Sequence, residues 1–193
     1  ALGSLLQPAG LRQHPLLAYR GLICVFLALN KAQVSTDSWT YFPDKGFIFG
    51  RTHEPKNWSS HMVPDASMTS LALEIFTDAH SPLWQQPDAM ISQQAVSELV
   101  NLGALREEEV AQSWVVRIPH AYPIYKAGYE KELTAVTQTL DRWPNLHLLG
   151  RTGSFRYLNS DGVIEDVFHF LERRFWGKVD DEAVALFENS RWV

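Results

Sequence analysis

A short apolar run, Gly21–Leu29, constrains the fold of this chain more than any other feature. A transmembrane helix needs about 20 such residues, so this run is too short by roughly half. Its β-branched and aromatic residues are interspersed with leucines, and no polar face alternates with the apolar one. That pattern predicts a central β-strand buried on both faces. No apolar stretch is longer, and the sequence predicts no membrane span.

The composition indicates a folded domain and excludes several classes of protein. The chain has 193 residues, of which 46% are hydrophobic and 20% charged, enough for one folded domain and too apolar for disorder. The 17 Lys and Arg against 22 Asp and Glu form no basic stripe, so no nucleic-acid partner is predicted. The single cysteine, Cys24, excludes an internal disulfide and favours a reducing compartment, the cytoplasm.

Strands are predicted mainly in the first half of the chain and helices in the second. The expected strands are Gly21–Leu29, Trp39–Phe42, Phe47–Arg51, Ser70–Thr77, Trp114–Ile118 and Leu146–Leu149, the second and third joined as a hairpin by a Pro-Asp-Lys-Gly turn. The expected helices are Met90–Leu102, Tyr129–Trp143, Gly162–Phe175 and 180–187. The third helix is apolar over a broad arc and is predicted to be covered on more than one side. This order predicts an α+β fold, a mixed and mostly antiparallel sheet of about six strands with helices packed on one side.

Several common kinds of chemistry have no motif here. His53 and His61 lie eight residues apart, but neither Cys-x-x-Cys nor His-Glu-x-x-His occurs, so no metal site is predicted. No Gly-x-Ser-x-Gly marks a nucleophilic serine. Cys24 is predicted to be an unreactive side chain packed in a buried strand. The glycines near residue 150 lack the spacing of a phosphate loop.

The segment Gly150–Asp161 is the clearest candidate for a binding site. It reads Gly-Arg-Thr-Gly-Ser-Phe-Arg-Tyr-Leu-Asn-Ser-Asp and precedes an apolar helix. The unpaired amides and positive dipole end of that helix, with Arg151 or Arg156, can hold an anion. From spacing alone, the alternative of a capped helix with surface arginines is favoured over an anion site.

Three collinear segments resemble UDP-galactopyranose mutases and a related set of FAD-dependent amine-oxidase and protoporphyrinogen-oxidase-like proteins. Gly150–Asp161 is similar to the mutase segment Gly-Arg-Leu-Gly-Thr-Tyr-Arg-Tyr-Leu-Asp-Met-Asp. Ala121–Ile124, followed by a helix and Asn145–Leu148, parallels Tyr-Tyr-Pro-Ile, helix and Asn-Ile-Thr-Phe. Phe49–Lys56 parallels Tyr-Thr-Arg-Ile-Thr-Glu-His-Lys. Beyond Glu54, the chain resembles the oxidase-like set more than the mutases.

The resemblance implies roles for seven residues. Arg151, with the turn Asn159, Ser160 and Asp161, would contact the cofactor FAD, where helix amides meet charge that grows on flavin reduction. Arg51, Tyr122 and Tyr157 would bind a small-molecule substrate, such as a nucleotide sugar in the mutases. Asn159 and Ser160 replace the Asp and Met of the mutases. No catalytic residue is identified.

The resemblance also implies a larger enzyme. The Gly-x-Gly-x-x-Gly turn that grips the ADP part of FAD in this superfamily does not occur, and the chain has no initiator methionine. We therefore expect residues 1–193 to be one domain, the C-terminal part of a flavoenzyme whose partner is its own dinucleotide-binding region. Residues 18–120 would be a sheet-rich substrate-binding region, and residues 121–193 a helical region with a flavin-facing loop at 150–162. Such a chain alone is expected to bind FAD weakly and to be inactive.

Three functions stay open at this point. The first is an FAD-dependent oxidoreductase that takes a hydride from a substrate carbon. The second is a UDP-sugar mutase, in which reduced flavin acts as a nucleophile. The third is a non-catalytic interaction module that keeps the layout without the cofactor.

Overall fold

The computed structural model describes residues 14–176 and separates the chain into two compact units. One unit comprises Tyr19–Ala121 and contains the sheet and the helix that covers it. The other comprises the segments Ala1–Ala18 and Tyr122–Val193, whose described part is mainly helical. The helix predicted at 180–187 lies outside the described residues.

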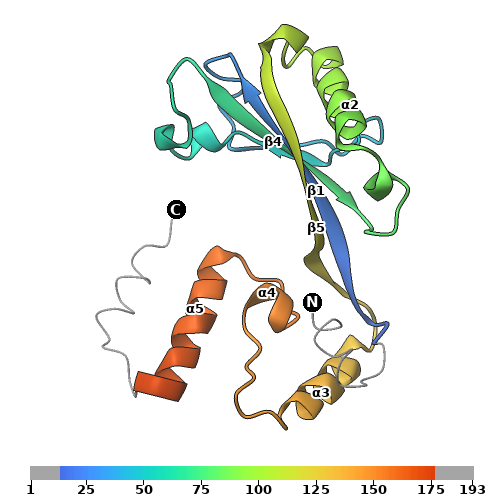
Figure 1. The fold of residues 1–193 in the computed structure, drawn as a ribbon, viewed down its shortest axis with the longest axis vertical. Helices are drawn as coiled ribbons and strands as arrows, with labels where there is room; N and C mark the ends of the chain where they lie inside the picture. Colours follow the sequence, from blue (N-terminus) through green and yellow to red (C-terminus); the bar gives the residue numbers. More distant parts are fainter. Residues whose placement is uncertain (1–13, 177–193) are drawn as a thin grey trace. The chain divides into compact units, whose positions relative to one another are not determined.

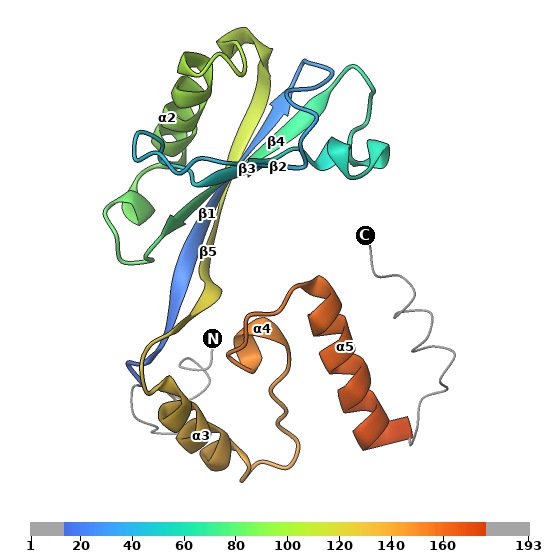
Figure 2. The same ribbon diagram turned by 180° about the vertical axis from the view of Figure 1, so that it is seen from behind.

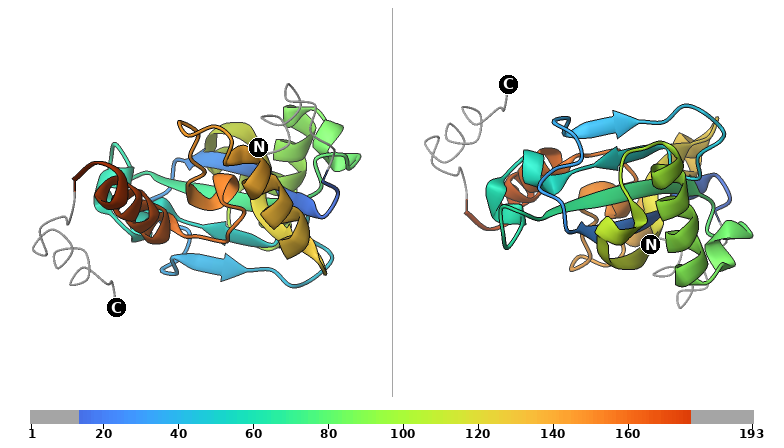
Figure 3. Two further views of the ribbon diagram at one scale, coloured as in Figure 1. Left: turned by 90° about the horizontal axis from the view of Figure 1, so that it is seen from below. Right: turned by 90° about the horizontal axis from the view of Figure 1, so that it is seen from above.

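Five strands form the sheet, in the order β2-β3-β4-β1-β5. They are β1 (Leu17–Leu29), β2 (Trp39–Tyr41), β3 (Arg51–His53), β4 (Thr69–Thr77) and β5 (Val110–Tyr125). The long strands β4, β1 and β5 lie side by side (Figure 1). β1 pairs antiparallel with β4, and β3 pairs antiparallel with both β2 and β4. The backbone bond from Asn30 to Glu109 and the ring pair Phe26–Trp114 give β5 the same antiparallel sense beside β1. β2 lies at the sheet edge (Figure 3).

The register divides the sheet into two faces because successive residues of a strand point in opposite directions. One face carries aliphatic side chains at every second position, namely Ile23, Val25, Leu27 and Leu29 of β1 and Leu71, Leu73 and Ile75 of β4. The central strand is therefore apolar on this face throughout, as the run in the sequence predicts.

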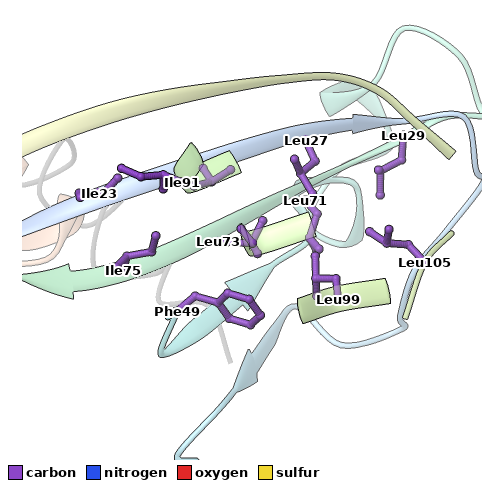
Figure 4. Close-up of a cluster of buried hydrophobic side chains, with 12 residues drawn as sticks. Ile23, Leu27, Leu29, Phe49, Leu71, Leu73, Ile75, Ile91, Leu99 and Leu105 are labelled. Carbon is purple, nitrogen blue, oxygen red and sulfur yellow. The ribbon is translucent and has the colours of Figure 1, made fainter. Parts of the chain in front are cut away.

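Helix α2 (Asp88–Asn101) covers this aliphatic face (Figure 2). Its residues Ile91, Ala95 and Leu99 recur at helical spacing and are at most 2% exposed. Together with the strand residues, Phe49 and Leu105, they form one buried cluster (Figure 4). All of its members come from residues 23–105, so this unit holds a complete core of its own.

The fold class predicted from the sequence is confirmed. The strand predicted at Trp114–Ile118 is much longer, Val110–Tyr125, and two other predicted strands differ more. The hairpin forms, but its second strand is Arg51–His53 and not Phe47–Arg51. The reason is that Phe47 and Phe49 pack with Phe42 as an aromatic cluster at the edge of the core. The segment Leu146–Leu149, predicted as a sixth strand, is irregular and joins no sheet.

The described part of the second unit contains three α-helices, α3 (Tyr129–Leu140), α4 (Gly150–Gly153) and α5 (Ser160–Leu171). A π-helical turn, η6 (Glu172–Trp176), continues α5 to the end predicted for that helix. No residue of α5 is buried, which contradicts the prediction that it is covered on more than one side. The short 3₁₀ helices, all in the sheet unit, are η2 (Pro55–Asn57), η3 (Ser60–Met62), η4 (Leu83–Gln85) and η5 (Glu107–Glu109).

Candidate functional site

The sheet face opposite α2, which we call the open face, carries rings and one charged cluster. Pairing places Trp39 opposite His53 and His53 opposite Ala72, while Phe26 faces Ala72 from the next strand. Phe26 stacks on Trp114 of β5, with 5.6 Å between ring centroids. One row of side chains thus crosses all five strands.

The neighbouring row carries the charge. Arg51 of β3 pairs with Glu74 of β4, and Glu74 pairs with Cys24 of β1. Arg51 Nη2 lies 2.7 Å from Glu74 Oε2, and His53 Nδ1 lies 3.5 Å from Glu74 Oε1. The carboxylate is therefore shared between a guanidinium and an imidazole, one at each oxygen.

Aromatic rings surround this charged cluster. The Arg51 guanidinium lies 4.4 Å from the ring of Trp39 and 5.5 Å from that of Phe76. The His53 ring lies 4.5 Å from Trp39 and 5.2 Å from Trp58. Cation–π contact holds the guanidinium in place, while the two indoles fix the plane of the imidazole.

The electrostatics favour an ionised Glu74 and a neutral Cys24. Burial alone raises the pKa of Glu74, but the close contacts and charge of His53 and Arg51 outweigh it and hold this pKa below its ordinary value. Burial, with Glu74 nearby, raises the pKa of Cys24 to about 11. Cys24 is therefore a neutral thiol in the middle of β1, as its place in the apolar run predicts.

The loop after β3 is organised by the motif Glu54–Asn57. The Glu54 carboxylate is 1% exposed and accepts hydrogen bonds from the backbone N–H groups of Val34 and Ser35 and from Thr69 Oγ1. Asn57 Nδ2 donates to the carbonyls of Ser35 and Asp37. The polar groups of Glu54 and Asn57 are thus used mainly in hydrogen bonds to the backbone. The motif therefore fixes the conformation of this loop.

Lys56 also holds this loop in place. Its ammonium donates to the carbonyls of Ala32, Ala66 and Met68 at 2.7, 2.6 and 2.9 Å. Three loop segments are thereby tied to one cation, and the following Trp58 is held against His53.

In the helical unit, Arg151 lies beside a stacked pair of tyrosines. Its guanidinium is 5.0 Å from the ring of Tyr122 and 4.8 Å from that of Tyr157, and the two rings are themselves 5.7 Å apart. Arg151 Nε donates to the Leu158 carbonyl at 2.7 Å, directly before the first turn of α5. The structure thus joins three of the residues predicted from the sequence.

Asn159, Ser160 and Asp161 form the start of α5. Asn159 is the N-cap residue in an extended conformation, but its side chain makes no capping hydrogen bond. The helix begins at Ser160, two residues before the predicted start. Its first amides have no partner within the helix, and Asp161 lies in the first turn, where the dipole favours it.

Two features fix the loop between α4 and α5. Asp166 accepts hydrogen bonds from Gly150 N at 3.0 Å and Arg156 Nη2 at 2.5 Å, and these bonds lower its pKa. Phe155 is 1% exposed with φ of 52°, a left-handed conformation that costs a bulky residue free energy. Arg156 is therefore paired with Asp166 and has a structural role. Arg151 lies beside the start of α5, bonded to the Leu158 carbonyl.

Helix α5 exposes apolar side chains. Ile164, Val167 and Phe168 are 40%, 37% and 39% exposed. In the part of the chain that the structure describes, no helix is long and apolar enough to cross a membrane. Among the same residues, no group of three or more His, Cys, Asp or Glu side chains could hold a metal ion.

The predicted site residues therefore lie in two clusters. Arg151, Tyr122 and Tyr157 form one at the start of α5, and Arg51 lies in the other unit with Glu74. Sequence reasoning missed Glu74 as the partner of Arg51 and His53 as the second group on that carboxylate. The signal was present, since Glu74 is the one charged residue of Thr69–Thr77 and charge in a buried strand needs a partner.

The fold is similar to part of the structures of a UDP-galactopyranose mutase and a protoporphyrinogen-oxidase-like protein, which confirms at the level of the fold the resemblance seen in the sequence. One similar structure is a reduced UDP-galactopyranose mutase, with a TM-score of 0.61 and 22% identity over 73% of this chain. Another is a protein from Exiguobacterium sp. 255-15, provisionally named a protoporphyrinogen oxidase, with a TM-score of 0.63 and 16% identity over 78% of this chain.

At these identities the likeness shows the fold alone. The chain spans 30% of the mutase chain and 34% of the Exiguobacterium chain, about a third of each. No family model matches the sequence, and the search of curated proteins finds no match.

Proposed function

We propose that this chain is the substrate-binding and flavin-facing portion of a cytoplasmic FAD-dependent oxidoreductase. The observation that carries the proposal is the position of Arg151, stacked on Tyr122 and Tyr157 and bonded to the carbonyl just before α5. These residues belong to the segments that resemble the flavin and substrate segments of the superfamily.

The residues present fit a flavin. The start of α5 offers amides without a side-chain cap, and a guanidinium lies on the adjacent carbonyl. A reduced flavin carries negative charge on its pyrimidine side, and a helix N-terminus with a nearby cation stabilises such charge. In the complete enzyme, the flavin would accept a hydride from a carbon of the substrate.

This chain's own residues would bind and orient. Arg151 and the amides at Ser160 and Asp161 would hold the anionic edge of the flavin. Tyr122 and Tyr157 would position the substrate and hold the Arg151 guanidinium beside their rings. Arg51, fixed by Glu74 and Trp39, would present a positive charge on the open face.

The proposed partner is the dinucleotide-binding region of the same enzyme. The support is that the chain spans about a third of its structural neighbours and that α5 exposes Ile164, Val167 and Phe168. If that region packs on these side chains, their apolar surface is removed from water. Without that region, the chain alone is proposed to bind FAD weakly and to be inactive.

The experiment is spectroscopic. The complete gene product that contains this chain should be yellow, and Arg151→Met should lower its flavin reduction potential because the reduced anion loses a cation. Arg142→Met, which removes an exposed arginine, should leave the potential unchanged. A colourless product, or equal potentials in both variants, would contradict the proposal. Tight stoichiometric FAD binding to residues 1–193 alone would contradict the proposed dependence on the partner region.

The second candidate is a UDP-sugar mutase, favoured by the pair of tyrosines that flank Arg151. There the tyrosines and Arg151 would hold a diphosphate. UDP binding that is lost in Tyr157→Phe would favour the mutase, whereas indifference to UDP would favour the oxidoreductase. The third candidate, a non-catalytic interaction module, predicts a complete gene product without flavin.

A further inference from the structure

We propose that His53 is a proton-accepting ligand site on the open face, held in its accepting form by Glu74. The class of ligand is a flat ring that carries an acidic O–H or N–H group. The inference rests on the proposed function in one respect, that the open face carries the substrate.

The first step is the division of the Glu74 carboxylate. Oε2 is engaged by Arg51 at 2.7 Å, so Oε1 is the oxygen directed to His53 Nδ1, at 3.5 Å. Nδ1 is buried and makes no hydrogen bond of good geometry among the described residues. A proton on Nδ1 would face the carboxylate, whereas a lone pair there would be repelled by it. The arrangement therefore selects the tautomer with hydrogen on Nδ1.

The other ring nitrogen of His53, Nε2, is left to accept a hydrogen bond. In the Nδ1–H tautomer, Nε2 is an acceptor. No group within residues 14–176 donates a hydrogen bond to Nε2, while the His53 side chain keeps 16% of its surface exposed. The site thus has an acceptor that the folded chain does not use.

The third step gives the shape of the ligand. Trp39 and Trp58 contact the His53 ring and are 38% and 50% exposed. Farther along the same row, Trp114 is 43% exposed. Ring faces that flank a single acceptor suit a planar ligand that stacks and donates one hydrogen bond.

The charges around His53 favour an uncharged donor. The imidazole lies against the Glu74 anion of β4, which is itself paired with the Arg51 cation of β3, and Cys24 of β1 stands opposite Glu74 as a neutral thiol. The nearest contacts from β2 and the loop, Trp39 and Trp58, carry no charge. The two formal charges cancel, so neither an anion nor a cation is preferred over a neutral ligand. If the donor transfers its proton, its O–H or N–H bond breaks, an N–H bond forms at Nε2, and Glu74 faces the resulting imidazolium.

The first test reads the tautomer directly. In the chain labelled with ¹⁵N-histidine at neutral pH, the resonances of His53, assigned with His53→Phe, should show hydrogen on Nδ1. Glu74→Gln should shift His53 toward the Nε2–H form that free imidazole prefers, and Glu108→Gln, at an exposed acid, should not. An Nε2–H tautomer in the unchanged chain would overturn the proposal.

The second test uses phenol as the probe and anisole as its matched control, since anisole keeps the ring and lacks the O–H. Phenol should bind about tenfold more tightly than anisole, the effect of one hydrogen bond, and should shift the Nε2 resonance. His53→Phe, which keeps a ring but no acceptor, should abolish the preference. Equal binding of the two probes, or no binding of phenol, would overturn the proposal. Neither test involves flavin, so failure here and failure of the proposed function are distinguishable.

Discussion

At the scale of single residues, the shared carboxylate of Glu74 supports a stability prediction. Glu74→Gln removes the charge that compensates Arg51, whose side chain is only 19% exposed. An uncompensated, mostly buried guanidinium should lower the free energy of unfolding by about 3 kcal/mol. Urea denaturation measures this loss, with Glu108→Gln as a control that should change stability by less than about 0.5 kcal/mol. Equal stability of the two variants would contradict a stabilising ion pair.

The same residue predicts a dependence on pH. The folded chain holds the pKa of Glu74 below its ordinary value of 4.5, so the unfolded chain binds this proton more readily. The stabilisation is therefore complete above about pH 4.5 and is lost as the pH falls through the folded-state pKa. Urea midpoints measured from neutral to acidic pH should converge for the unchanged chain and Glu74→Gln. A gap that stays constant on acidification would contradict this assignment.

Lys56 supports a second prediction at this scale. Lys56→Met leaves the carbonyls of Ala32, Ala66 and Met68 without their donor, and the loop between β3 and β4 should open more often. Amide hydrogen exchange in residues 60–68 should accelerate by about tenfold, the equivalent of one lost hydrogen bond to a charged group. Lys45→Met, at an exposed turn, is the matched control. Unchanged exchange would show that Lys56 does not hold the loop.

Residue identities indicated part of the candidate site, whose function stays a prediction. The resemblance of three segments indicated Arg51, Arg151, Tyr122 and Tyr157, and the structure stacks the last three together. The partners of Arg51 were not predicted because strand register decides them, and register is set by long-range pairing that spacing does not reveal. Asn159 has the residue type of an N-cap, yet its side chain makes no capping bond.

At the scale of elements, periodicity was a good guide where one face packs on the core. Helix α2 and the strands β1 and β4 were predicted within a few residues, because each presents apolar side chains at its own period. Leu146–Leu149 has the composition of a strand, but no strand of the described sheet pairs with it. Composition alone cannot supply a pairing partner.

Asp166 links α4 to α5 and supports a prediction for this pair of elements. Asp166→Asn removes the charge that Arg156 contacts and weakens acceptance from Gly150 N. Hydrogen exchange across residues 150–158 should accelerate by about tenfold, while α2 should be unaffected. Glu165→Gln changes the neighbouring exposed acid and should have no effect. Identical exchange in both variants would contradict a fastening role for Asp166.

At the scale of the whole molecule, the sheet unit should fold without the helical one. Every member of its buried cluster comes from residues 23–105, and the five strands end at Tyr125. A fragment of residues 17–125 should therefore show cooperative unfolding and dispersed amide resonances. Collapsed resonances without a cooperative transition would show that the sheet depends on the rest of the chain.

The position of Cys24 has a practical consequence. The chain has one cysteine, and it lies in the central strand with a pKa of about 11, so almost none of it is thiolate at neutral pH. An alkylating reagent will react appreciably only after β1 has separated from its neighbours. The rate at which Cys24 is alkylated under native conditions therefore reports how often β1 separates from its neighbours. Mass spectrometry can measure this rate without any engineered probe.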